Sequence, residues 1–241
     1  NVIIGDGTNV ASLSLASGKG ITGAVKVAAN STFTINGTSG AFSSSLDAAS
    51  SSSRGTAVFA ANYTLASGNS IGATNALGTL VINSGVTLNA QTNNKAITSN
   101  IVSLAANDSV LMLGTGTVTG TVQSVTDATA TVNFNAANTL GGDIGSSGHT
   151  LGNINVANGI TVSVGTYNLR ASSINLNNNT STLTFAGGNF FGKIDGVGAS
   201  SSTGVVNFNS TTSISSGNYI GLDGLGGGNG ILTLSVGNGA T

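Results

Sequence analysis

Acidic residues are the first groups in this sequence to consider for chemistry, because pairs of carboxylates catalyse glycoside hydrolysis. The two acids of such a pair lie within roughly 5–10 Å of each other. The interval from Asp127 to Asp143 would place these two acids on neighbouring turns of a coiled β-structure. No basic or aromatic cluster accompanies them, and the chain has only three Tyr and no Trp to stack on sugars. We therefore expect scattered turn acids, with a polysaccharide-degrading enzyme as the alternative. The seven acidic residues are Asp6, Asp47, Asp108, Asp127, Asp143, Asp195 and Asp223.

The single histidine offers a second kind of chemistry. A hydrolytic triad would combine His149 with a serine and an acid such as Asp143, but the sequence has no Gly-x-Ser-x-Gly elbow for the nucleophile. We expect His149 to be a solvent-facing loop residue. One histidine and no cysteine also leave zinc without a ligand set.

Two glycine motifs match known binding patterns only in spacing. Gly18-x-Gly20-x-x-Gly23 has the dinucleotide-binding spacing, but strand-like "AVKVAANSTFTI" follows where a helix must hold the pyrophosphate. "GGNGILTLS" at 227–235 resembles a calcium-binding nonapeptide, but Leu232 replaces the ligating aspartate and there is one copy. The sequence thus predicts no catalytic residue, no cofactor-binding residue and no metal ligand.

The composition describes a neutral chain that folds. Charged residues make up 5% of it, against roughly 25% in ordinary globular proteins. A net charge of −1 provides no footprint for nucleic acid and no basic patch for anionic lipid. Because 39% of the residues are hydrophobic and regularly spaced, the Gly/Ser/Asn/Thr-rich chain is not expected to be disordered. The absence of Pro leaves every strand able to donate its N–H groups.

Apolar residues alternate with Ser, Thr or Asn along most of the chain, which is the two-residue period of a strand with one buried face. Clusters of Gly, Asn and Ser separate the runs, as turns require. The expected strands are 12–17, 24–29, 32–37, within 79–90, 130–137, within 153–164, 172–178, 181–187, 204–210 and 230–236.

Similar triplets recur among these strands and favour one β-architecture. "VNF" at 132–134, "INV" at 154–156 and "INL" at 174–176 follow one another at a nearly constant interval, and "VNF" returns at 206–208. A recurrence of roughly 20 residues fits the coils of an all-β solenoid, a right-handed parallel β-helix. A β-sandwich is the alternative, although it has no reason to repeat triplets at a fixed interval. The residues expected to point inward in stacked columns are Val132, Phe134, Ile154, Val156, Ile174, Leu176, Val206 and Phe208.

The neutral polar residues between these apolar ones fit the same architecture. Like residues of a parallel stack lie about 4.8 Å apart, where columns of charge repel and columns of Asn, Ser or Thr hydrogen-bond. Three segments interrupt the pattern: 43–55, expected as a loop or short helical turn, the connection 196–204, and the Gly-dense 221–230. None reads as a linker between cores, so we expect one domain over residues 1–241.

The run "ATVNFNAANTLGGDIGSSGHTLGNINVANGITVSVGTYNLRASSINLNNNTSTLTFAGG" at 130–188 resembles the passenger region of rickettsial surface-cell-antigen autotransporters of the outer membrane protein A and B type. "IGATNALGTLVINSGVTLNA" at 71–90 is similar in style. The resemblance implies a passenger carried to the bacterial surface by a membrane barrel, where it forms a coat and adheres to host cells. No residue carries over with a functional role, because the shared phrases are scaffold.

These features predict an extracellular protein of the bacterial cell surface. The absence of Cys suits a chain exported unfolded, and the start at Asn1 without a signal sequence suggests a processed product or a fragment. Strand-like termini with little charge favour self-association into a filament or coat. A host-cell receptor or glycan is a further expected partner, whereas nucleic acid and direct membrane insertion of this segment are not expected.

Overall fold

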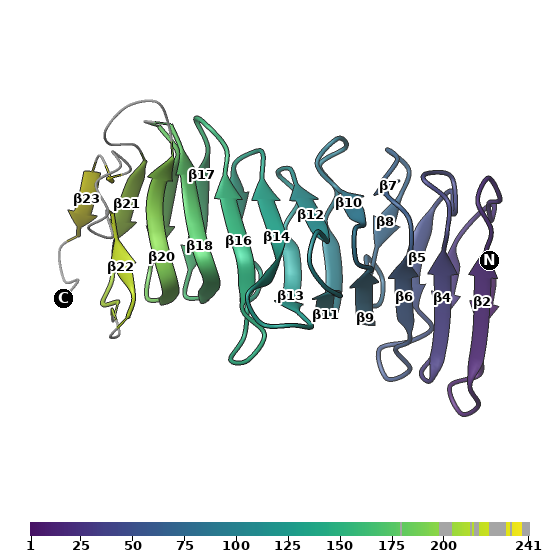
Figure 1. Ribbon diagram of the computed structural model, residues 1–241. Helices are drawn as coiled ribbons and strands as arrows, with labels where there is room; N and C mark the ends of the chain where they lie inside the picture. Colours follow the sequence, from purple (N-terminus) through teal and green to yellow (C-terminus); the bar gives the residue numbers. More distant parts are fainter. Residues whose placement is uncertain are drawn as a thin grey trace.

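The computed structural model is a stack of short β-strands, and it describes residues 1–178, 180–197, 204–212, 214, 217–221, 230–231 and 233–237. The strands follow one another along a single elongated stack, with β2 near one end and β23 at the other (Figure 1). No helix occurs in these ranges, and hence none that would be long and apolar enough to cross a membrane.

The strands form three sheets. The 10-stranded sheet contains β1 (Val2–Ile4), β3 (Val25–Val27), β5 (Ser45–Ala48), β8 (Ser70–Ile71), β11 (Ile97–Leu104), β9 (Leu77–Ile82), β6 (Thr56–Phe59), β4 (Ser31–Ile35) and β2 (Ala11–Leu15) in that order, with β13 (Val118–Ser124) also on β11. The 8-stranded sheet contains β22 (Tyr219–Ile220), β20 (Phe190–Val197), β18 (Leu169–Asn177), β16 (Leu151–Val156), β14 (Thr129–Phe134), β12 (Val110–Leu113), β10 (Thr87–Asn89) and β7 (Tyr63–Thr64). The 5-stranded sheet contains β15 (Asn138–Thr139), β17 (Thr161–Gly165), β19 (Thr182–Phe185), β21 (Val205–Phe208) and β23 (Thr233–Val236).

The pairing of the strands makes the molecule a β-solenoid. Strands pair in parallel, and each takes its partner from the next coil along the chain, as β14 does with β16 and β16 with β18. Sandwiches of the immunoglobulin type are built from antiparallel strands, so the alternative of a β-sandwich is wrong and the expected solenoid is confirmed.

The core follows the predicted register. Ile154 lies between Val132 and Ile174 in one column, and Val156 lies between Phe134 and Leu176 in the next. All eight residues expected to face inward are buried, with 5% exposure or less. The triplet at 206–208 belongs to a different column, because β21 pairs with β19 in the 5-stranded sheet.

Asparagine side chains form a ladder on the outer face of the 8-stranded sheet. The Asn155 amide donates to Asn133 Oδ1 over 2.8 Å, and the Asn175 amide donates to Asn155 Oδ1 over 2.8 Å. The three residues are in register on β14, β16 and β18. Asn155 therefore donates to one neighbour and accepts from the other, and the expected neutral column is present across these three coils before it reaches Asp195 on β20.

The segments expected to be irregular have mixed outcomes. Within 43–55, Ser45–Ala48 forms strand β5, so the expectation of a loop or helical turn is wrong there. The reason is that Leu46 and Ala48 are fully buried and pair with β3. The many serines around them make the segment look like a loop in the sequence. Residues 198–203 of the second segment and 222–229 of the third lie outside the described residues.

Candidate functional site

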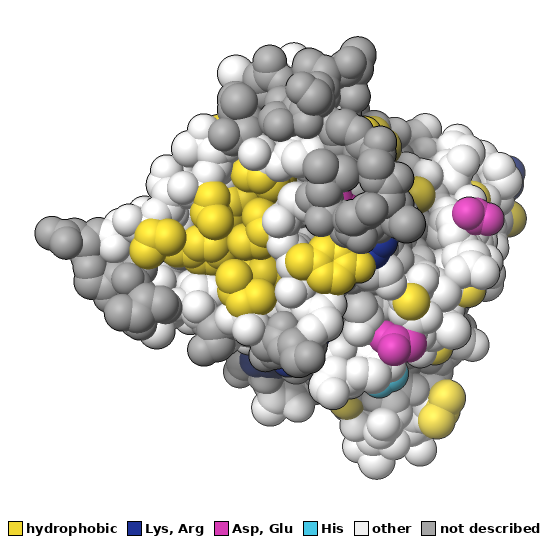
Figure 2. Space-filling model, turned by 60° about the vertical axis from the view of Figure 1, so that its left-hand side comes forward, with side chains coloured by type: hydrophobic (Ala, Val, Ile, Leu, Met, Phe, Trp, Pro, Cys, Tyr) yellow, Lys and Arg dark blue, Asp and Glu magenta, His cyan; other side chains and the backbone are white. Residues whose placement is uncertain are grey.

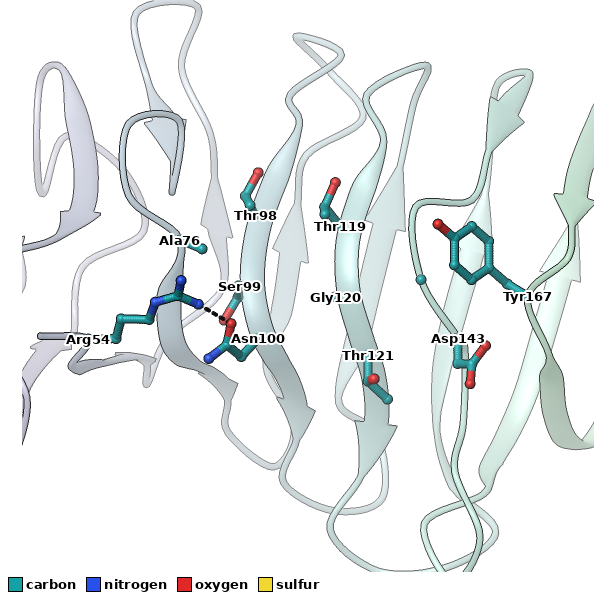
Figure 3. A pocket seen from close by; sticks show the side chains of 11 residues that line it. Arg54, Ala76, Thr98, Ser99, Asn100, Thr119, Gly120, Thr121, Asp143 and Tyr167 are labelled. Atoms are coloured by element: carbon teal, nitrogen blue, oxygen red, sulfur yellow. Dashed lines mark hydrogen bonds between the residues drawn. The ribbon is translucent and has the colours of Figure 1, made fainter. Parts of the chain in front are cut away.

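A groove of about 560 Å³ runs along one corner of the solenoid (Figure 3). It crosses successive coils, from Arg54 at one end, past Asn100 on β11 and Thr121 on β13, to Asp143 and Tyr167 at the other. The lining residues come from segments far apart in the sequence, so the groove is a product of the stacking.

The corner exists because β11 and β13 bend together. Their register shifts between Thr98 and Ile101, where β11 passes from its pairing with β8 to its pairing with β9. Gly120 lies at this shift with a φ of +112°, and a Cβ there would be 1.7 Å from the carbonyl oxygen of Ser99. A Cβ on Gly142 would be 2.1 Å from the carbonyl oxygen of Gly120. The floor of the groove is therefore bare backbone, and side chains form only its walls.

Arg54 makes one end of the groove positive. Its Nε donates to the carbonyl oxygen of Ser51 over 2.8 Å, and its Nη1 donates to Asn100 Oδ1. Among the described residues no carboxylate pairs with this half-buried guanidinium, and its Nη2 has no partner. The side chain is thus held in one orientation while its charge stays uncompensated.

Asp143 makes the other end negative. Its Oδ1 accepts from the backbone N–H of Asn168 over 2.9 Å, and its Oδ2 accepts from the Asn168 amide over 3.2 Å. The half-buried ring of Tyr167 lies beside it (Figure 3). The carboxylate keeps lone pairs for hydroxyl donors of a ligand, and the ring gives it an apolar face.

Threonines line the walls between these two ends. Figure 3 shows Thr98 and Thr119 side by side on β11 and β13, with Thr121 across the groove. Within the described ranges none of the three hydroxyls has a protein partner, so all can donate to and accept from a ligand. The described lining carries one carboxylate, whereas glycoside hydrolysis uses two. The lining therefore offers hydroxyl groups and one carboxylate that can form hydrogen bonds to a ligand.

The two acids predicted as a catalytic pair are not brought into one site. Asp143 lies in the groove, but Asp127 lies in the turn between β13 and β14 and is not part of the lining. Asp127 Oδ1 accepts from the backbone N–H of Thr150, on the next coil, over 2.7 Å. Asp47 does the same for Thr74 over 3.1 Å. These acids join neighbouring coils by capping backbone N–H groups.

Three of the remaining acids have different settings, and the fourth lies outside the described residues. Asp6 accepts from the backbone N–H groups of Asn9 and Thr8 within its own turn, and these bonds lower its pKa to about 2. The others are Asp108 in a turn with φ +64°, Asp195 on β20, and Asp223 outside the described residues.

We expect Asp127 to titrate below its ordinary pKa of 3.8, since hydrogen bonds from the Thr150 side chain and backbone N–H lower the pKa and the charge of His149 adds to this. A carboxyl group with a lowered pKa in the folded state stabilises that state at pH values above its ordinary pKa of 3.8. This stabilisation is lost as the pH falls through the lower pKa of the folded state. Asp127→Asn should therefore lose less stability on acidification than the parent chain. NMR titration of the Asp127 carboxyl group measures its pKa. A pKa above 3.8, as a general acid requires, would contradict the prediction.

His149 lies in the predicted loop, between β15 and β16, and its side chain is partly exposed to solvent and partly buried. The ring is partly buried, because Nδ1 donates over 3.0 Å to the carbonyl oxygen of Ser124 on the preceding coil. A ring fixed in this way links two coils and is not oriented toward a serine nucleophile.

The glycine motifs also find structural places. Gly18, Gly20 and Gly23 lie between strands β2 and β3, so a strand follows where a dinucleotide site needs a helix. Of the nonapeptide at 227–235, residues 227–229 and 232 lie outside the described residues, and 233–235 belong to strand β23 (Thr233–Val236). In the part of the chain that the structure describes, no three acidic, His or Cys side chains gather as a metal site.

Sequence reasoning did not single out Arg54, Asn100 or Tyr167. The one feature of the sequence that could have drawn attention to Arg54 and Tyr167 is that their residue types are rare, since the chain has only six Lys and Arg residues and three Tyr. Rarity alone cannot place Arg54 beside Asn100, since the two residues are far apart in the sequence.

Comparison with protein-family models, curated proteins and solved structures gave no match. The resemblance to rickettsial autotransporter passengers therefore stays a prediction.

Proposed function

We propose that this chain is a structural protein of the bacterial cell surface, which forms a coat or filament and acts as an adhesin. The observation that carries the proposal is the outer surface of the stack, where Asn133, Asn155 and Asn175 bond from coil to coil without charge. Such columns let a solenoid extend over many coils. An extended rigid rod is a physical form suited to a coat or to projecting an adhesive surface.

The use of the acids supports a structural role over an enzymatic one. Asp47, Asp127 and Asp143 each cap a backbone N–H group of the neighbouring coil. A polysaccharide-degrading β-helix enzyme, the alternative, needs a second acid facing Asp143 across the groove, and no other carboxylate of the described residues lines it.

Self-association is the second part of the proposal. At one end, Leu234 and Val236 of β23 continue the columns of Val206 and Phe208, yet they are 53% and 61% exposed. Figure 2 faces this end and shows hydrophobic side chains gathered on it. At the other end, Leu13 and Leu15 of β2 continue the columns of Phe33 and Ile35 and are only half-buried. A second copy would cover these apolar ends.

We expect the 241-residue chain at micromolar concentration to sediment as assemblies larger than its 23.2 kDa monomer. Leu234→Ser should shift the distribution toward monomer, because it removes apolar surface from the end. Val125→Ser is the matched control, since Val125 is also 53% exposed but lies in a turn on the side of the stack. A single 23.2 kDa species for the parent chain, or equal effects of the two variants, would contradict the proposal.

A further inference from the structure

We propose that the corner groove binds an acidic oligosaccharide, with a sugar carboxylate on Arg54 and sugar hydroxyls along the threonine walls toward Asp143. The inference rests on the proposed adhesin role and names the class of ligand that this surface would recognise.

Arg54 is the group that selects a carboxylate. Its guanidinium is oriented by Ser51 and Asn100, and its Nη2 faces no partner within the described residues. A planar guanidinium held in one orientation binds a carboxylate with little loss of side-chain entropy. The Asn100 amide, which accepts from Arg54 through Oδ1, retains its NH₂ group as a second donor at the same end.

Three other cations of the stack already have partners, unlike the Nη2 group of Arg54. The Arg170 guanidinium lies 3.3 Å from the centroid of the Phe191 ring, and the Lys193 ammonium lies 5.8 Å from that of Tyr219. Lys95 Nζ donates to the carbonyl oxygen of Ser67. Arg54 combines a free donor with a place in the corner groove of about 560 Å³.

The middle of the groove suits sugar hydroxyls. Thr98, Thr119 and Thr121 present unpaired hydroxyls above a floor of backbone. Asn100 and Asp143 are separated by two coil steps of about 4.8 Å each, hence by about 10 Å. This length accommodates more than one sugar ring, and the Tyr167 face beyond it can pack against the apolar face of a ring.

The charge pattern excludes polyanions as preferred ligands. One unpaired cation faces one carboxylate along the groove, so a chain of phosphates or sulfates that gains at Arg54 is repelled at Asp143. A ligand with a single carboxylate and a neutral, hydroxyl-rich remainder matches both ends. Otherwise neutral oligosaccharides that end in one uronic acid or one sialic acid share this chemistry.

The test is titration of the full chain, by calorimetry or NMR, with two singly acidic trisaccharides, glucuronosyl-xylobiose and sialyllactose, and with the neutral sugar lactose. Binding of at least one acidic probe, about tenfold or more tighter than lactose, is expected, and which probe binds identifies the source of the carboxylate. Arg54→Gln should weaken that binding at least about tenfold, whereas Lys19→Gln, which removes an exposed charge from a turn, should leave it unchanged. Absence of binding by both acids up to about 10 mM, equal binding of lactose, or equal effects of the two variants overturns the inference.

The same samples separate this inference from the proposed function. Release of reducing ends from either acidic probe, abolished by Asp143→Asn, would overturn the structural role while leaving groove binding intact. Assemblies in sedimentation without any glycan binding would overturn the groove assignment alone. Polyphosphate competing as well as the acidic sugar would replace the glycan by a general anion site and also overturn the assignment.

Discussion

Replacing Ile154 with aspartate should unfold the middle of the solenoid. Ile154 is fully buried on β16, stacked between Val132 and Ile174. The substitution removes about 1.5–3 kcal/mol of hydrophobic burial and places a carboxylate among apolar side chains without a partner. We expect the free energy of unfolding to fall by more than about 4 kcal/mol, measured by urea denaturation.

Asn153→Asp is the matched control, because it introduces the same side chain one position earlier on the same strand. Asn153 is exposed and faces outward beside Thr131 and Ser173. Its replacement should change the free energy of unfolding by less than about 0.5 kcal/mol. If the two variants were equally stable, the register of β16 would be wrong by a single position.

The architecture was predictable because residues stacked on successive coils are similar, so similar residues recur in the sequence at the length of one coil. Ile154 repeats Val132 one coil later and is itself repeated by Ile174 on the following coil, and each partner is found in register. Alternation within each strand then determines which residues face inward. Ser45–Ala48 escaped prediction because its inward residues, Leu46 and Ala48, sit in a serine-rich context and because Asp47 between them is buried as well.

The candidate site was not predictable, and the spacing of its residues explains why. Residues of neighbouring coils that cap one another are one coil apart in the sequence, as Asp127 is from Thr150 and Asp143 is from Asn168. The interval between Asp127 and Asp143 is shorter than a coil, so the two acids occupy different places around the cross-section. Arg54 and Asn100 are two coils apart and meet only because Arg54 reaches past an intervening coil.

The groove also depends on the register shift between β11 and β13, and no sequence motif predicts this shift. Gly120 is one of 37 glycines, and most of the others that have a positive φ lie in turns. That glycine is required at position 120 follows only from the structure, where the Ser99 carbonyl oxygen lies in the space that a Cβ would occupy. A short-range sequence pattern does not predict this contact between residues 120 and 99.

Gly120→Ala should lower the free energy of unfolding by about 3 kcal/mol or more, because two costs combine at this position. The φ of +112° is strained for any residue with a Cβ, and the new Cβ would lie 1.7 Å from the Ser99 carbonyl oxygen. That oxygen belongs to the backbone of β11, so relief of the clash requires β11 and β13 to separate at the corner. Chemical denaturation measures the loss.

Gly85→Ala isolates the first of these costs. Gly85 has a φ of +69° in the turn between β9 and β10, and a Cβ there would meet no atom within 4 Å. Alanine in that conformation should cost about 1–2 kcal/mol through backbone strain alone. A loss at Gly120 no larger than that at Gly85 would mean that the corner yields readily and that the groove floor is not rigid. A larger loss would instead make Gly120 the residue that holds β11 and β13 close enough for Arg54, the threonines and Asp143 to face one groove.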